Sequence, residues 1–505
     1  MTTEQSGSVD QPNLGRRVAK GATWMILLRF ALRGIGLINT LILARLLVPE
    51  DFGLIALAMV TITLLDTFSE FGFDMALIQN QKATRAHYDT AWTIIIVKQL
   101  ITAALLYLLA PVIAGFFEEP RLIEVIRVLC VLPLLQGLRN IGVINFTKNL
   151  NFRKEFQLRI SRKISAVCVV IPLAFIWRDY WALIAGLVAG RTVELVLSYV
   201  MHSYRPRLAL SEWRSLFGFG KWMLVNNAMT FLGAKLDTLL IGKFMDAKMV
   251  GIYNVSFEIS NLPTSELLRP IARALYPGYS KIADDRTRMA ESYLISLALV
   301  FLIAAPLGVG IAVTAHHIIV VVLTEKWLEA VPFIAILALH GVLKLGASNV
   351  APVLLALNRP NVLAYLTIFQ NVVRFPLLVG GVVYYGAYGV AWALVATAAI
   401  STLAHVAVTL RLLRVSPAAF AGAFWRPLIA LAAMVAAVTA FDAQWATEAS
   451  VLAMAAELLA MVGIGVVSYV GTDLILWRLS GAPNGAERQI VQVMRERLSR
   501  RTQVA

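Results

Sequence analysis

Two stretches of the chain, TWMILLRFALRGIGLINTLILARLLVPEDFG (23–53) and KWMLVNNAMTFLGAKLDTLLIGKFMDAKMVG (221–251), align without gaps at an offset of 198 residues. They share a Trp-Met pair, a Thr-Leu pair, a basic residue and a final glycine, and Asn39 corresponds to Asp237. A second match joins WALIAGLVA (181–189) to YGVAWALVA (388–396). The pattern predicts two copies of a six-helix unit, with the first helix of each copy facing a shared central cavity.

The composition places these helices in a membrane. The 505 residues are 59% hydrophobic before the 32 glycines are counted, and only 15% are charged. Soluble domains are about 45–50% apolar with glycine included and about 25% charged. A water-soluble globule of this composition could not cover its surface with polar groups. This excludes a soluble enzyme, a disordered chain and a secreted disulfide scaffold, and the mean hydropathy of +0.74 fits a membrane protein.

Apolar runs of about 20 residues, the length that crosses a bilayer as a helix, recur along the whole chain. None alternates as a barrel strand does. The predicted fold is an all-α polytopic membrane protein of about 14 transmembrane helices, in two pseudo-symmetric six-helix bundles plus two C-terminal helices. The predicted runs are 20–45, 52–77, 90–116, 121–147, 156–177, 180–202, 215–243, 249–275, 290–314, 328–357, 361–385, 387–411, 426–440 and 450–478.

The basic residues between the runs predict the orientation. One alternating set of segments carries 24 Lys and Arg and the opposite set carries six, so the positive-inside rule places both termini in the cytoplasm. The net charge of +15 then reflects topology, and no nucleic-acid partner is expected. The predicted parts are an N-terminal segment (1–19), a first lobe (20–202), a cytoplasmic linker (203–214), a second lobe (215–411), two further helices (426–478) and a basic cytoplasmic tail (479–505).

Ionisable residues inside the predicted spans are the candidate functional residues. Each costs about 2.5–3.5 kcal/mol at membrane depth unless it faces a partner or water. Cations outnumber acids among the deeper ones, which favours a cavity for an anionic substrate, and the planar fork of arginine suits phosphate. The candidate substrate-binding residues are Arg29, Arg33, Lys98, Arg139, Arg269, Arg273 and Arg374. The candidate ion-coupling residues are Asp66, Glu70, Asp237 and Glu258.

A structural alternative stays open for each of these residues. Arg29 and Arg33 could neutralise Asp66 and Glu70 on a neighbouring helix, and Arg269 could pair with Glu266 three residues away. His316 and His317 are adjacent and lack metal-ligand spacing, so no metal site is expected. No nucleotide-binding or hydrolase motif occurs in the sequence, and the loops are too short for an enzyme domain. We therefore expect no cofactor and no catalytic residue.

Four segments resemble the polysaccharide transporter family, the Wzx-type flippases of the multidrug/oligosaccharidyl-lipid/polysaccharide exporter superfamily. They are ARLLVPEDFGLIALA (44–58), EFGFDMALIQ (70–79), NLNFRKEF (149–156) and ELLRPIARALYPGYSKI (266–282). The resemblance implies two six-helix lobes around a cavity, with arginines of the first and eighth helices, here Arg29, Arg33, Arg269 and Arg273, binding pyrophosphate. It also implies two extra C-terminal helices that form a groove for a lipid tail.

The function implied is export of undecaprenyl-pyrophosphate-linked oligosaccharides across the bacterial inner membrane by alternating access, for exopolysaccharide, capsule or O-antigen (lipopolysaccharide) assembly. The implied partners are the lipid-linked substrate, the lipid bilayer, and a polysaccharide polymerase and co-polymerase. Two alternatives from other classes remain. A cation-coupled drug exporter shares the architecture, and a membrane glycan polymerase or ligase is the enzymatic alternative, disfavoured by the short loops.

Overall fold

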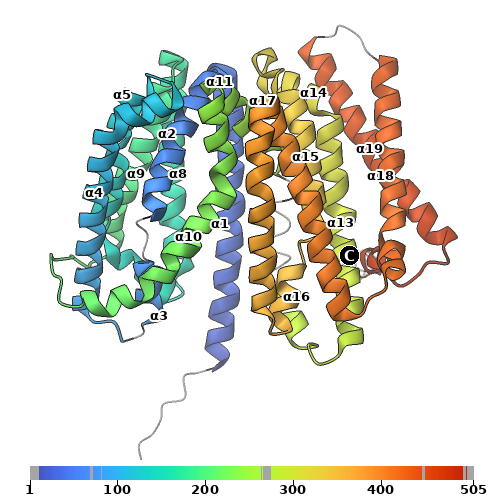
Figure 1. Ribbon diagram of the computed structural model, residues 1–505, viewed down its shortest axis with the longest axis horizontal. Helices are drawn as coiled ribbons and strands as arrows, with labels where there is room; N and C mark the ends of the chain where they lie inside the picture. Colours follow the sequence, from blue (N-terminus) through green and yellow to red (C-terminus); the bar gives the residue numbers. More distant parts are fainter. Residues whose placement is uncertain are drawn as a thin grey trace, which may run out of the picture. The chain divides into compact units, whose positions relative to one another are not determined.

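The structure is a computed structural model that describes residues 11–68, 72–80, 82–262, 264, 275–445, 450–492 and 496. Every regular element within these ranges is a helix (Figure 1). Nine of the described helices are long and apolar enough to cross a membrane. This confirms the predicted all-α polytopic membrane fold, while the count of fourteen spans stays a prediction.

The chain forms two compact units, Met1–Gly251 (unit 1) and Ile252–Ala505 (unit 2). The division lies within helix α11 (Ala247–Ser260), C-terminal to the predicted linker 203–214. Helix α10, which opens the second predicted lobe, packs against α2, α3 and α4 of unit 1. The assignment of residues 215–411 to one lobe by the repeat therefore stays a prediction.

Unit 1 is built mainly from long helices, with α8 packed along α9 and α1 packed on α8. Short helices fill the region between α4 and α8, where one span over 121–147 was expected. Its described helices are α1 (Gln11–Leu46), α2 (Pro49–Phe68), α3 (Phe73–Gln79), α4 (Arg85–Phe117), α5 (Leu122–Leu129), α6 (Val131–Leu138), α7 (Ile144–Lys148), α8 (Phe152–Trp177), α9 (Trp181–Met201) and α10 (Trp213–Phe244).

The interruption of the run 121–147 has a local cause. Pro133 has no backbone N–H to bond the carbonyl of Leu129, so the helix breaks between α5 and α6 at Cys130. Helix α6 then ends at Arg139, whose backbone is extended (φ −56°, ψ 138°). Arg139 therefore lies at a helix end instead of in the middle of a span.

Unit 2 continues the helical pattern. The helix α17 bends at Gly386, where φ is 59° and ψ is −144°, and this bend coincides with the predicted boundary between the runs 361–385 and 387–411. A π-helical segment, Ile319–Leu323, follows α14. The remaining described helices are α13 (Arg286–Val313), α14 (Ala315–Ile318), α15 (Ala330–Leu345), α16 (Val350–Ala356), α17 (Pro360–Leu413), α18 (Pro417–Trp445) and α19 (Val451–Leu479).

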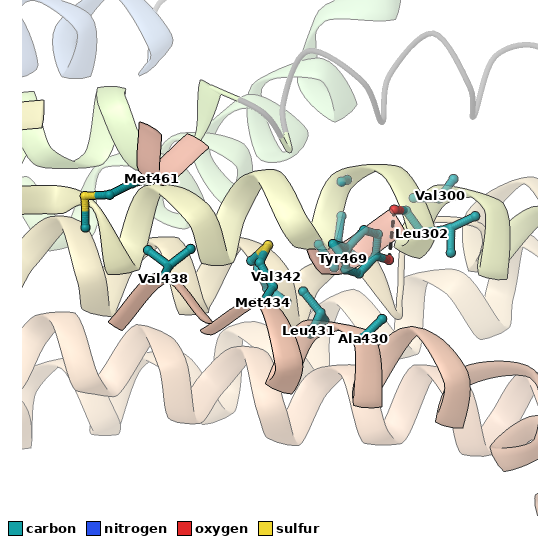
Figure 2. Close-up of a cluster of buried hydrophobic side chains, with 12 residues drawn as sticks. Val300, Leu302, Val342, Ala430, Leu431, Met434, Val438, Met461 and Tyr469 are labelled. Carbon is teal, nitrogen blue, oxygen red and sulfur yellow. Dashed lines mark hydrogen bonds between the residues drawn. The ribbon is translucent and has the colours of Figure 1, made fainter. Parts of the chain in front are cut away.

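The C-terminal hairpin of α18 and α19 is packed into unit 2 through a hydrophobic cluster (Figure 2). Met434 and Val438 of α18 lie in the same cluster as Met461 of α19 and residues of α13 and α15. The Tyr469 hydroxyl donates a hydrogen bond to the Leu302 carbonyl at 3.1 Å. Beyond the hairpin, the Arg426 Nε donates to Glu487 Oε1 at 2.8 Å, which holds the start of the predicted tail.

Two glycines matched by the repeat meet in unit 1. A Cβ on Gly53 would lie 1.6 Å from the Ala247 carbonyl oxygen, and one on Gly251 would lie 1.9 Å from the Pro49 carbonyl oxygen. Helix α2 and the first turn of α11 therefore approach backbone to backbone. Only glycine permits this distance, because backbone atoms cannot rotate away as a side chain can.

We expect Gly53→Ala to lower the free energy of unfolding by about 1–3 kcal/mol, the usual cost of overpacking. Thermal unfolding of the purified protein in detergent checks this. Gly34→Ala in α1 is the matched control, because nothing lies within 4 Å of its added Cβ, and alanine is the better helix former. Equal melting temperatures for the two variants would contradict the close approach.

Candidate functional site

A polar cavity lies inside unit 1, among α2, α3, α4, α6, α8 and α9. One part has a volume of about 300 Å³ and is lined by Asp66, Asp74, Lys98, Arg139 and Arg191. Two adjoining pockets share Arg191 and extend the cavity along α8 to Arg162. The structure thus brings together three of the site residues predicted from the sequence, Asp66, Lys98 and Arg139. It adds Asp74, Arg162 and Arg191.

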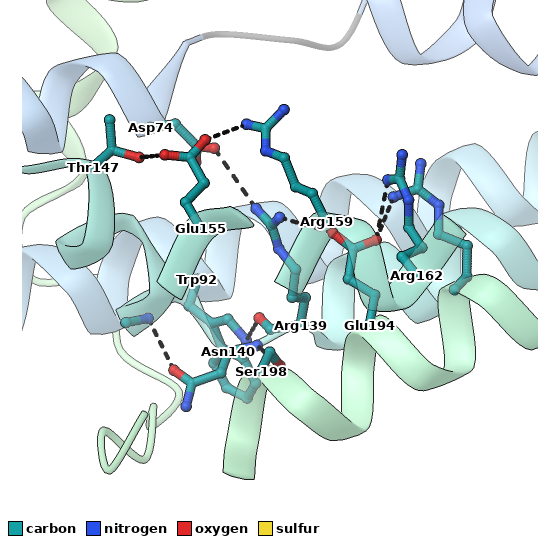
Figure 3. Close-up of polar contacts among 12 residues, drawn as sticks. Asp74, Trp92, Arg139, Asn140, Thr147, Glu155, Arg159, Arg162, Glu194 and Ser198 are labelled. Atoms are coloured by element: carbon teal, nitrogen blue, oxygen red, sulfur yellow. Dashed lines mark hydrogen bonds and ion pairs between the residues drawn. The ribbon is translucent and has the colours of Figure 1, made fainter. Parts of the chain in front are cut away.

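Glu194 of α9 lines one of these pockets with a carboxylate whose side chain is 5% exposed (Figure 3). Three guanidinium groups contact it: Arg139 at 3.3 Å, Arg162 at 3.2 Å and Arg191 at 3.0 Å. A buried carboxylate is stable in a membrane only when it is paired in this way. Glu194 therefore holds three arginines of three different helical elements around one point.

Close packing of α8 on α9 makes this contact possible. A Cβ on Gly186 would lie 2.7 Å from the Val170 Cβ, and one on Gly190 would lie 3.0 Å from the Arg162 carbonyl oxygen. Two small residues four apart let helix backbones approach closely in a membrane. Glu194 follows Gly190 by one turn on the same face of α9, so it meets Arg162 directly.

The backbone around Arg139 is fixed by hydrogen bonds to other elements (Figure 3). Trp92 Nε1 donates to the Arg139 carbonyl at 3.2 Å. The Asn140 N–H donates to Ser198 Oγ at 3.0 Å, and Asn140 Nδ2 donates to the Tyr204 carbonyl at 2.7 Å. These contacts join α4, α9 and the following loop to the end of α6, so the Arg139 side chain has a defined direction.

The loop after α9 is held in turn by Asp89. The Tyr204 hydroxyl donates to Asp89 Oδ1 at 2.7 Å, and the Arg207 N–H donates to the same oxygen at 2.8 Å. Burial, together with the hydrogen bond to Asp89, raises the pKa of the Tyr204 hydroxyl. Tyr204 therefore stays protonated and remains a donor to Asp89 throughout the physiological pH range.

Two further ion pairs lie at the cavity edge. Arg139 Nη2 is 3.8 Å from Asp74 Oδ2, and Lys98 Nζ is 3.7 Å from Asp66 Oδ1. The described residues that line the three pockets include six cations and four acids, an excess of two positive charges. The cations are Lys98, Arg139, Arg159, Arg162, Lys163 and Arg191, and the acids are Asp66, Asp74, Glu155 and Glu194. The arrangement suits an anion of about two charges.

The other predicted site residues lie elsewhere or outside the described part. Arg29 and Arg33 lie in α1 and are not among the described residues that line this cavity, although a Cβ on Gly36 would lie 3.7 Å from Lys163 Nζ. Asp237 is buried in α10 and accepts the Thr238 N–H at 2.9 Å. Glu258 lies in α11 and Arg374 in α17. Glu70, Arg269 and Arg273 lie outside the described residues.

Sequence reasoning missed Arg162, Arg191 and Glu194 as site residues. The available signal was the segment GLVAG (186–190), whose glycines predict a helix–helix contact. A carboxylate one turn beyond that contact needs cationic partners on the facing helix.

Comparison with known proteins identifies the family of the chain. The model of the family described as polysaccharide biosynthesis protein matches residues 42–332. Lipopolysaccharide biosynthesis protein WzxC of Escherichia coli (strain K12) is 25% identical over 386 residues, which cover 75% of this chain and 78% of WzxC. Teichuronic acid biosynthesis protein TuaB of Bacillus subtilis (strain 168) is 24% identical, with 70% of this chain and 74% of TuaB covered.

Solved structures show the same fold. Lipid II flippase MurJ in an inward closed conformation superposes with a TM-score of 0.72 at 15% identity, covering 90% of this chain and 98% of MurJ. An inward-facing multidrug resistance MATE family transporter of the MOP superfamily gives a TM-score of 0.59 at 13% identity, covering 76% and 96%.

Proposed function

The chain belongs to the polysaccharide biosynthesis protein family, and from this we propose that it is a flippase for undecaprenyl-pyrophosphate-linked oligosaccharides. It moves repeat units across the membrane by alternating access for exopolysaccharide, capsule or O-antigen assembly. The named relatives act in lipopolysaccharide and teichuronic acid biosynthesis, and a third, ExoT of Rhizobium meliloti (strain 1021), is a succinoglycan biosynthesis transport protein. We place it in the bacterial inner membrane with cytoplasmic termini.

The observation that carries the proposal is the cluster of arginines around Glu194. Each guanidinium has five N–H donors, and a carboxylate offers about four acceptor sites. Three arginines therefore keep most of their donors after satisfying Glu194. Their side chains are 29%, 41% and 32% exposed for Arg139, Arg162 and Arg191, so these donors are accessible from the cavity.

A pyrophosphate diester matches the arginine N–H donors that Glu194 leaves available. It carries about two negative charges, which equals the positive excess of the cavity lining, and its oxygens accept the paired N–H groups of arginine. Glu194 holds the guanidinium groups in place before the substrate arrives, so binding costs less side-chain entropy. Asp74 and Asp66 neutralise Arg139 and Lys98 while the cavity is empty of substrate.

A cation-coupled drug exporter remains the alternative, because the MATE transporter shares the fold. The positive excess of the cavity disfavours a cationic drug. Lys98 Nζ also lies 3.7 Å from Asp66 Oδ1, which weakens Asp66 as a sodium site.

We also propose two protein partners, a polysaccharide polymerase and a co-polymerase, which act on the substrate after it has been flipped.

Proteoliposomes that contain the purified protein and an undecaprenyl-pyrophosphate-linked oligosaccharide test the function. We expect protein-dependent movement of the sugar to the opposite leaflet, detected with an impermeant glycosidase. Outward movement of two negative charges from a negative interior is favoured by roughly 4.6 kcal/mol per 100 mV. We therefore expect the membrane voltage alone to support transport.

Two outcomes would overturn parts of this proposal. Export of a cationic drug without movement of the lipid-linked sugar would assign the chain to the drug exporters. If the transport rate does not depend on the membrane voltage but falls to zero when the pH or sodium gradient collapses, the protein is an antiporter and the voltage-driven step is wrong. Asp66, Glu70, Asp237 and Glu258 would then be the residues to replace.

A further inference from the structure

A second group of ionisable residues lies in unit 2, where the region after α13 meets the C-terminal hairpin. His317 of α14 faces Asp442 of α18 and Glu457 of α19. His317 Nε2 is 3.6 Å from Asp442 Oδ1 and 3.5 Å from Glu457 Oε2. The ligand atoms of the three residues all lie within 4.8 Å of one another. We propose that these three side chains form a binding site for a divalent transition metal of the zinc class.

The distances favour a shared metal over direct hydrogen bonds. An N–H···O hydrogen bond spans about 2.7–3.2 Å, and both distances from His317 Nε2 exceed this range. Zinc ligands lie about 2.0–2.2 Å from the ion at tetrahedral angles, so neighbouring ligand atoms are roughly 3.3–3.6 Å apart. Both separations from His317 Nε2 match this edge, as an ion shared by the three side chains requires.

Charge and chemistry agree with the distances. Two carboxylates and a neutral imidazole carry a charge of −2, which a divalent cation neutralises. One nitrogen and two oxygen ligands suit zinc, with a fourth position left for water, whereas magnesium prefers oxygen ligands alone. His317 and Glu457 are buried, with 8% and 6% of their side chains exposed, and Asp442 is 46% exposed. Asp442 therefore offers the ion a route from solvent.

The site joins α14 to both helices of the hairpin. The hydrophobic cluster of Figure 2 joins the same hairpin to α13 and α15. Glu457 begins the buried stripe of α19 that continues through Met461 and Tyr469. Asp442 lies near the C-terminal end of α18. A bound ion would fix this end of the hairpin against α14. This metal site does not depend on the proposed transport function.

Metal content and thermal stability of the full-length chain test the site. The protein is purified in detergent without a polyhistidine tag, stripped with EDTA and titrated with ZnCl₂. We expect one Zn²⁺ per chain by elemental analysis and a melting temperature that rises with Zn²⁺ and not with Mg²⁺. Loss of one ligand in His317→Gln or Glu457→Gln should weaken binding at least about tenfold, since even outer-shell partners contribute 10–100-fold.

His316→Gln is the matched control, because His316 is the adjacent residue and is exposed. It should bind Zn²⁺ as the unmodified protein does. Asp442→Asn gives a third ligand variant at a half-exposed position, so it tests binding even if the buried variants fail to fold. An unmodified protein that retains no Zn²⁺, or equal affinity in His317→Gln, Asp442→Asn and His316→Gln, would overturn the proposal.

Discussion

Replacing Arg139 with alanine is expected to abolish polysaccharide export while the protein remains in the membrane. Arg139 ends α6, and Glu194 and Asp74 direct its guanidinium into the cavity. A bidentate contact to pyrophosphate comprises two charge-assisted hydrogen bonds of about 1.5–3 kcal/mol each. Their loss corresponds to roughly 10²–10⁴-fold weaker substrate binding. Flipping in proteoliposomes and polymer yield in cells measure the effect.

Two variants make this result specific. Arg139→Lys should recover part of the activity, because lysine keeps the charge and loses the bidentate fork. Arg121→Ala serves as the matched control in unit 1, since Arg121 pairs with Glu119 at 2.8 Å at the start of α5 and away from the cavity lining. If Arg139→Ala and the control both export polysaccharide at the unmodified rate, Arg139 does not bind the substrate. Its ion pairs with Glu194 and Asp74 are then purely structural.

Replacing Glu194 with alanine is expected to destabilise unit 1 more than any single change at its surface. Removing one partner of a buried pair costs about 3–5 kcal/mol, because the remaining charge loses its compensation. The three arginines are each about a third exposed, so water screens them in part. We therefore expect the lower end, about 3 kcal/mol. Thermal or denaturant unfolding in detergent gives the value.

The comparison variants separate charge from packing. Glu194→Gln keeps the volume and part of the hydrogen bonding, so its loss of stability should come mainly from charge. Glu118→Ala removes an acid that is 77% exposed and pairs with Lys243 at 3.1 Å, and exposed pairs contribute about 0.2–1 kcal/mol. If Glu194→Ala and Glu118→Ala melt at the same temperature, the three-arginine arrangement around Glu194 is not a stabilising centre.

The sequence alone was sufficient for the class of fold. Apolar runs of membrane length, interrupted by prolines and glycines, can satisfy their backbone groups in a bilayer only as helices, and the described residues are helical throughout their regular elements. It also singled out Lys98, Arg139 and Asp66, which line the cavity of unit 1, because a charge at membrane depth needs a partner or water wherever it occurs. Their role in binding or coupling stays a prediction.

Tertiary structure decided which charges meet. Arg139, Arg162 and Arg191 converge on Glu194 because α6 ends at Arg139 and because Gly186 and Gly190 bring α9 against α8. His317 meets Asp442 and Glu457, which both follow it by more than a hundred residues, through the packing of the hairpin. Periodicity reports which face of a helix is apolar, whereas the partner of a buried charge depends on which helices pack together, and at what distance.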